Sequence, residues 1–201
     1  MNSICVFGDS VGWGAWDLER GGWVNRLWFY LAKREGDDYI EVYNCSVSGG
    51  TTDTILERFQ GEAKIRSADV LIFQTGGNDA SYEHTPGNYL VPPDKFRKNL
   101  EEIIRRAQKI TKNIVFMDIR NCDESKTMPV PWIDIYYTNE NIGKYSGMMK
   151  DVCAENGVYF LELPLLSDAQ FDDGLHPNAW GHEKIYETVR GFLLKSGWIS
   201  E

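Results

Sequence analysis

One serine, one histidine and a pair of carboxylates occupy positions in this sequence that suit acyl transfer. Ser10 lies in residues 8–12 (GDSVG), and His176 closes residues 172–176 (DDGLH). A serine hydroxyl is a weak nucleophile until a neighbouring imidazole takes its proton. That imidazole works better when a carboxylate fixes its tautomer and stabilises the imidazolium. We therefore predict Ser10 as nucleophile, His176 as base and Asp173 as the orienting acid.

The tetrahedral intermediate of acyl transfer needs hydrogen-bond donors that are already in place for its oxyanion. The candidate donors are the backbone N–H groups of Ser10 and Gly49 and the side-chain amide of Asn78. Gly49 lies in residues 46–50 (SVSGG) and Asn78 in residues 76–79 (GGND), and each segment follows a short apolar run, as Ser10 does. We predict that these three donors form an oxyanion hole.

Asp172, His182 and His84 are other residues of the types that the predicted base and orienting acid require. Asp172, next to Asp173 in the chain, is the competing carboxylate. His182 falls inside the last amphipathic stretch, where a packing or surface role is expected. His84 lies in a long connection and is expected to be exposed, with contact to a substrate as the alternative.

Short apolar runs and amphipathic stretches alternate along the whole chain, and these elements must position the candidate residues. The five predicted strands cover residues 4–7, 40–44, 70–73, 114–117 and 158–161. The predicted helices are centred on residues 23–31, 55–59, 96–110, 142–152 and 177–193. This alternation predicts a parallel sheet covered on both faces. Two long connections, 79–93 and 120–138, follow strand carboxyl ends, where open α/β sheets place their sites.

Composition narrows the class of protein and of partner. The 201 residues carry 21 Lys+Arg against 30 Asp+Glu, and the net charge of −9 argues against nucleic acid or an anionic membrane as partner. The length predicts one domain over residues 1–201. No apolar run approaches 18 residues and no signal peptide is visible, so we expect no membrane insertion and a cytoplasmic location. The four cysteines form no C-x-x-C pair, which predicts reduced, mostly buried thiols.

Four short blocks in this order resemble the SGNH hydrolase superfamily, also called GDSL esterases or lipases. The blocks are Gly8-Asp9-Ser10, Gly49, Gly76-Gly77-Asn78-Asp79 and Asp173 to His176. The resemblance implies a flavodoxin-like three-layer α/β/α sandwich with a five-stranded parallel sheet, and the same triad and oxyanion hole. It implies neither a metal nor an organic cofactor. Val11 departs from the pattern, because it stands where the family has leucine.

The function expected from these residues is hydrolysis of a small-molecule carboxylic ester, with acetyl or other short acyl groups favoured. An acyltransferase, a thioesterase or a lysophospholipase using the same triad is the alternative. A metal-dependent phosphoesterase would need more histidines at ligand spacing than this chain has. Candidate walls of the substrate pocket are Trp13, Trp16, His84 and Trp132, with Tyr136 and Tyr137 considered beside Trp132. The sequence does not determine the oligomeric state.

Overall fold

A five-stranded parallel sheet forms the centre of the molecule. The computed structural model describes residues 3–33, 39–118 and 121–200. The strands of this sheet, in spatial order, are β2 (Glu41–Asn44), β1 (Ser3–Gly8), β3 (Val70–Gln74), β5 (Asn113–Met117) and β7 (Tyr159–Leu161). Counted within this sheet alone, the order is 2-1-3-4-5, which is the flavodoxin-like order. The predicted fold class is confirmed.

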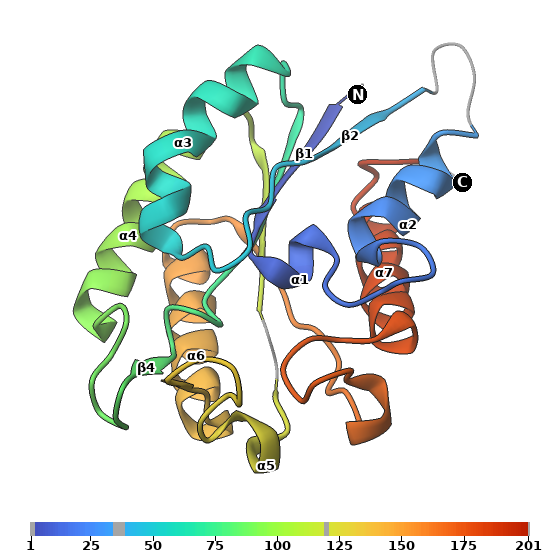
Figure 1. Cartoon of the computed structure of the whole chain (residues 1–201). Helices are drawn as coiled ribbons and strands as arrows, with labels where there is room; N and C mark the ends of the chain where they lie inside the picture. The colour runs from blue at the N-terminus through green and yellow to red at the C-terminus, as the bar shows by residue number, and fades with distance from the viewer. Residues whose placement is uncertain (1–2, 34–38, 119–120, 201) are drawn as a thin grey trace.

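Helices cover both faces of the sheet (Figure 1). One face carries α2 (Gly22–Leu31) and α7 (Ala179–Lys195), and the other carries α3 (Thr52–Ile65), α4 (Pro93–Ala107) and α6 (Asn139–Glu155). The helix predicted to open near Pro177 begins two residues later. Asn178 caps it instead, since its side-chain oxygen accepts the N–H groups of Trp180 and Gly181. None of the described helices is both long and apolar enough to cross a bilayer.

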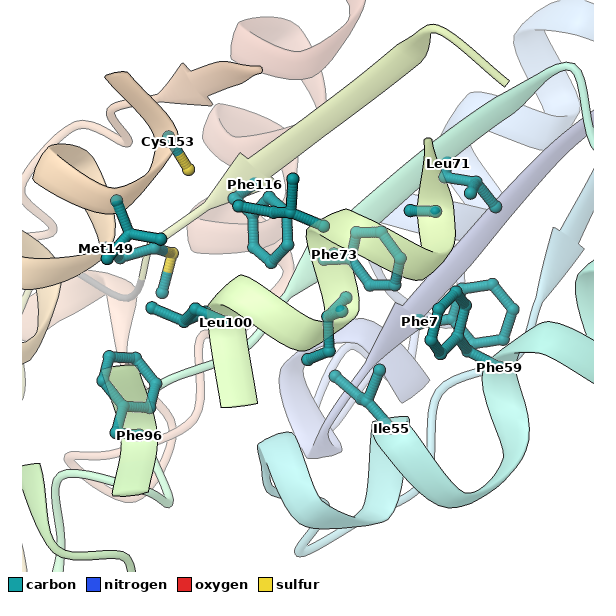
Figure 2. Packing of buried hydrophobic residues seen from close by; sticks show 14 of the residues in the cluster. Phe7, Ile55, Phe59, Leu71, Phe73, Phe96, Leu100, Phe116, Met149 and Cys153 are labelled. Atoms are coloured by element: carbon teal, nitrogen blue, oxygen red, sulfur yellow. The ribbon is translucent and has the colours of Figure 1, made fainter. Parts of the chain in front are cut away.

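Phenylalanine rings from three neighbouring strands pack in a row beneath the carboxyl edge of the sheet (Figure 2). Phe7, Phe73 and Phe116 are in register, with ring centroids 5.7 and 4.8 Å apart, and Phe59 of α3 packs edge-on against the first two. All four side chains are fully buried. This row fixes the strand ends from which the candidate residues emerge.

The two long connections are tied to each other, which the sequence did not predict. β4 (Tyr82–Glu83) pairs antiparallel with β6 (Ile135–Tyr136). Strands of two residues leave no alternating pattern that could be read from the sequence. The second expected connection starts at Arg120, which lies outside the described residues, and contains the short helix α5 (Glu124–Thr127). All four cysteines lie in the described part and are buried with free thiols, as predicted.

A buried ion pair anchors the segment that follows the first short helix, α1 (Ser10–Trp13). Asp17 and Arg26 lie 2.9 Å apart, with exposed side-chain fractions of 0% and 6%. The carboxylate of Asp17 also accepts the N–H groups of Glu19, Arg20 and Gly22, each at 3.1 Å. Both oxygens of this carboxylate therefore accept hydrogen bonds from residues of its own loop or of α2.

Asp17→Ala is expected to lower the free energy of unfolding by about 3–5 kcal/mol, because three N–H groups lose their acceptor and Arg26, which keeps Glu183 and the carbonyl of Ala179, loses its fully buried partner. Equilibrium unfolding in urea measures this loss. Leu18→Ala is the matched control, since Leu18 is 92% exposed and should change the free energy of unfolding by less than about 0.5 kcal/mol. Equal stability of the two variants would contradict the anchoring role.

Candidate active site

Ser10 lies at the carboxyl end of β1, where a tight turn starts α1. Asp9 caps this helix, because its side chain accepts the N–H of Val11 at 2.9 Å. The turn packs closely against Ser46, after β2, and Gln74, at the end of β3: a Cβ on Gly12 would lie 2.4 Å from Ser46 Oγ and 2.9 Å from Gln74 Oε1. A side chain at position 12 would have to displace these two residues, so glycine lets the turn that carries Ser10 lie this close to them. Ser10 itself is 8% exposed.

His176 and Asp173 complete a hydrogen-bonded row with Ser10. His176 Nε2 lies 2.9 Å from Ser10 Oγ, and His176 Nδ1 lies 2.6 Å from Asp173 Oδ2. The other carboxylate oxygen accepts the N–H groups of Leu175 and His176 at 2.9 and 2.8 Å. Partial burial raises the pKa of Asp173, but these hydrogen bonds outweigh it and lower the pKa to about 2. The carboxylate is thus ionised at neutral pH, as an orienting acid must be.

The neighbouring carboxylate stays outside this row. Asp172 is exposed, and its contact with His176 is made by the backbone: the N–H of Asp172 donates to the carbonyl of His176 at 2.9 Å. Gly174, with a φ of +92°, makes the turn that brings Asp173 back onto the ring of His176. A side chain at this glycine would be strained in backbone and would meet Lys126 Cβ at 2.7 Å. The geometry therefore selects Asp173 over Asp172.

Asn78 is held beside Ser10 by two hydrogen bonds. Its Nδ2 donates to the carbonyl of Gly50 at 2.9 Å, and its Oδ1 accepts the hydroxyl of Tyr137 at 2.7 Å. The second hydrogen on Nδ2 remains for a ligand. A pocket of about 280 Å³ opens between these residues, lined by Asp9, Ser10, Val11, Gly77, Asn78, Tyr137, Ile142 and Leu175. It lies where the strand order reverses between β1 and β3, the usual ligand crevice of such sheets.

Of the three predicted oxyanion donors, two line this pocket. The N–H of Ser10 belongs to the first turn of α1, where backbone donors have no intrahelical partner. Gly49 lies on the adjoining turn, exposed and with a φ of +75°, and is not one of the pocket-lining residues. That turn is fixed to the nucleophile segment, since the N–H of Val47 donates to the carbonyl of Gly8 at 2.9 Å.

Three residues support the site in ways that sequence reasoning missed. Tyr137 was considered a pocket wall, yet its hydroxyl orients Asn78, and burial raises its pKa so that it stays a donor. Gln74 Nε2 donates to Asp9 Oδ1 at 3.1 Å behind Ser10, and burial raises the pKa of Asp9. The Asp before a helix start is an N-cap signature that could have been read from the sequence. Gln74 carries no such signal, because it simply ends an apolar strand.

The candidate substrate residues fall into two groups. Trp13 and Trp16 lie next to the row of Ser10, His176 and Asp173: their rings are 6.0 Å apart, and the ring of Trp16 is 5.8 Å from that of His176. Trp132 is exposed, as Trp13 and Trp16 are, and none of the four predicted wall residues is among those that line the pocket at Ser10. His84 is exposed, as expected, and its ring lies 3.0 Å from Asp134 Oδ2.

His182 is fully buried, which agrees with the expected packing role. Its Nδ1 accepts the N–H of Trp23 at 3.2 Å, and its Nε2 lies 3.0 Å from the carbonyl of Ala15. Within residues 3–33, 39–118 and 121–200, no three His, Cys, Asp or Glu side chains converge in a way that could hold a metal ion.

Comparison with protein families gives a match over most of the chain. The profile of the GDSL-like Lipase/Acylhydrolase family matches residues 6–184. An arylesterase of Vibrio mimicus is 29% identical over 202 residues, covering 96% of this chain and 88% of that protein. A multidomain esterase of Ruminococcus flavefaciens is 26% identical over 189 residues, and the matched region is only 20% of that protein's length.

Solved structures agree with the fold. A lipase/acylhydrolase from Enterococcus faecalis superposes with a TM-score of 0.78 at 22% identity, covering 96% of this chain and 95% of the other. Axe2, an acetylxylan esterase from Geobacillus stearothermophilus solved as a catalytic mutant, gives a TM-score of 0.75 at 17% identity, covering 100% and 97% of the two chains. At these identities the likeness supports the architecture alone.

Proposed function

The chain belongs to the GDSL-like lipase/acylhydrolase family, and on this basis we propose that it is a serine esterase acting through an acyl-enzyme on Ser10. Membership confirms the predicted class, an ester hydrolase of the GDSL type, for the residues that the match spans. The observation that carries the specific proposal is the 2.9 Å contact of Ser10 Oγ with His176 Nε2. Because this contact joins a residue near the start of the family match to one near its end, we propose that residues 1–201 form a single hydrolase domain.

The reaction follows from the positions of these side chains. His176 Nε2 takes the hydroxyl proton of Ser10 as Oγ bonds to the ester carbonyl carbon, and Asp173 stabilises the imidazolium. The oxyanion accepts hydrogen bonds from the N–H of Ser10 and from Asn78 Nδ2, with the N–H of Gly49 as a third donor. The ester C–O bond then breaks as His176 returns the proton to the leaving alcohol. Water attacks the acyl-enzyme by the same path and releases the acid and free Ser10.

The substrate we propose is an ester with a short acyl group, such as acetyl. The pocket at Ser10 is small, about 280 Å³ including its mouth, and Tyr137, Ile142 and Leu175 bound it with apolar surface. Two similar proteins are named as an arylesterase and an acetylxylan esterase. A series of p-nitrophenyl esters of increasing acyl length, with acetylated sugars beside it, tests this choice. The highest kcat/KM on acetyl or butyryl esters is expected, and a preference for chains of ten or more carbons would overturn it.

The nucleophile is tested directly by a serine-directed organophosphonate. We expect one covalent adduct per chain on Ser10, located by mass spectrometry, and loss of esterase activity in proportion to labelling. Treatment with EDTA should leave activity unchanged, which separates this mechanism from metal-dependent hydrolysis. Complete inactivation by EDTA, or a phosphonate adduct on another serine, would contradict the proposal.

Asn78→Ala is expected to lower kcat by about 10²–10³, the usual effect of removing one oxyanion donor. KM should change little, because the lost hydrogen bond strengthens only as the oxyanion forms. Steady-state kinetics on p-nitrophenyl acetate give both constants. Asn88→Ala is the control: Asn88 lies in the connection that follows Asn78, is exposed, and its side-chain amide donates to the carbonyl of Glu83. A kcat for Asn78→Ala within threefold of the control would remove Asn78 from the oxyanion hole.

A further inference from the structure

Trp16 makes a direct contact with the candidate acid of the triad. Its indole N–H donates to Asp173 Oδ2 at 3.1 Å, and this is the same oxygen that lies 2.6 Å from His176 Nδ1. Within the described part of the chain, Trp16 and His176 are the only side chains that donate to Asp173. The ring of Trp16 stands edge-on to that of His176 at 65°. A residue expected only to wall the pocket thus touches the carboxylate that orients the base.

The backbone around Trp16 is fixed independently of its side chain. The N–H of Trp16 donates to the carbonyl of Pro177 at 3.0 Å, next to His176 in sequence. The N–H of Ala15 donates to the carbonyl of Ser10, also at 3.0 Å. These two bonds tie the segment to both partners of the catalytic row. The direction of the indole therefore follows from the same segment that carries the nucleophile.

Buried His182 holds this segment from the other side. Because its Nδ1 accepts the N–H of Trp23, its Nε2 carries the hydrogen and donates to the carbonyl of Ala15. Burial lowers the pKa of His182, which keeps the ring neutral and this pattern intact. Asp17, directly after Trp16, is anchored through Arg26. The indole N–H is thus presented to Asp173 by a rigid frame.

We propose that Trp16 is a positioning residue for the triad: its indole N–H holds Asp173 Oδ2 toward His176 and moderates the negative charge that this oxygen presents to the imidazole. The inference rests on the proposed function, since it assigns Trp16 a role through Asp173. A donor to a carboxylate draws electron density from the shared oxygen. Asp173 therefore stabilises the imidazolium of His176 less strongly when the indole N–H is bonded to it than it would without that bond. Removing the donor should therefore favour protonation of the imidazole and loosen the carboxylate.

Trp16→Phe tests the proposal, because it removes the N–H and keeps an aromatic ring. Loss of one hydrogen bond to a partly exposed charge should lower kcat on p-nitrophenyl acetate about three- to tenfold. KM should stay within twofold, and the acidic limb of the kcat/KM profile should move upward by about 0.3–0.8 pH unit. Trp28→Phe is the matched control, since Trp28 is also 42% exposed but lies on α2 against Phe29. It should reproduce the wild-type kcat and limb.

The pH readout isolates the Trp16 contact from the other charges around the triad. The charged or titratable groups around the triad are Asp9, Tyr137 and His182, with Asp17 and Arg26 near His182, Asp123 and Lys126 packed against Gly174, and Asp172 next to Asp173 in the chain. Both variants leave all of them in place. The pH at which the acidic limb of the kcat/KM profile falls does not depend on the fraction of enzyme that is folded. Poor folding of a variant therefore cannot imitate a shift of this limb.

Three results would overturn the assignment. One is an unchanged kcat and limb in Trp16→Phe. Another is a rise in KM alone, which would make Trp16 a pocket wall as first expected. The third is an equal shift in Trp28→Phe. Failure of the proposed function itself is distinguishable, because wild-type enzyme would then show no phosphonate adduct on Ser10.

Discussion

Ser10→Ala is expected to lower kcat on p-nitrophenyl acetate by on the order of 10⁶. The methyl group cannot bond to the ester carbonyl, so no acyl-enzyme forms, and the oxyanion donors and His176 are left to assist water alone. The residual rate should still exceed that of the uncatalysed reaction, because Asn78 and the backbone N–H of residue 10 remain. Single-turnover and steady-state kinetics with purified variant measure the loss.

The control for this variant is Ser48→Ala, in the exposed turn beside Gly49, which should retain wild-type turnover. Ser10→Ala should unfold at the wild-type urea midpoint within experimental error, since only a small hydroxyl is removed. Full turnover by Ser10→Ala, or labelling of this variant by the phosphonate, would rule out the acyl-enzyme on Ser10.

Asp173→Asn is expected to lower kcat by about 10⁴, the effect seen when a triad carboxylate becomes an amide. The amide can donate to His176 Nδ1, which would place the hydrogen on Nε2, and that nitrogen then cannot take the proton of Ser10. The geometry around the ring is preserved, because the Oδ1 position still faces the N–H groups of Leu175 and His176. Substrate binding should therefore survive while turnover is lost.

Asp172→Asn is the matched control, a neighbouring exposed carboxylate whose removal should leave kcat unchanged. The two variants differ by one position and by the same chemical change. A loss of 10³ or more in Asp172→Asn, with activity kept in Asp173→Asn, would reverse the assignment of the acid.

Most of the fold, and the family, could be predicted from the sequence, because buried strands and their ends leave a clear pattern of residue types. Buried parallel strands must be continuously apolar, so runs such as 70–73 identified the sheet, and each small polar segment after a run marked a strand end. The Asp-x-x-His block of the family resemblance favoured Asp173 over Asp172, and in the structure it is Asp173 that contacts the ring of His176. The four blocks were sufficient to predict the GDSL-type family, which is confirmed.

The contacts between loops could not be predicted from the sequence. Tyr137 reaches Asn78 across 59 positions and Trp16 reaches Asp173 across 157, and neither pair lies on a periodic element. Rings in loops carry no periodic signal, so Trp16 and Trp132 are both predicted as pocket walls, and His84 as exposed with substrate contact as the alternative. In the structure all three are exposed and none lines the pocket at Ser10, but Trp16 contacts Asp173 while His84 contacts Asp134.

Under the proposed mechanism, the contact between Ser10 and His176 also determines when activity appears during folding. The two residues are 166 positions apart, one after the first strand and the other just before the last helix. Closing so long a loop is a late and entropically costly step of folding. Under that mechanism, a folding chain whose residue 176 has not yet reached the carboxyl end of β1 holds a nucleophile without its base. Recovery of esterase activity during refolding therefore reports the docking of the last helix, later than any signal from the central strands.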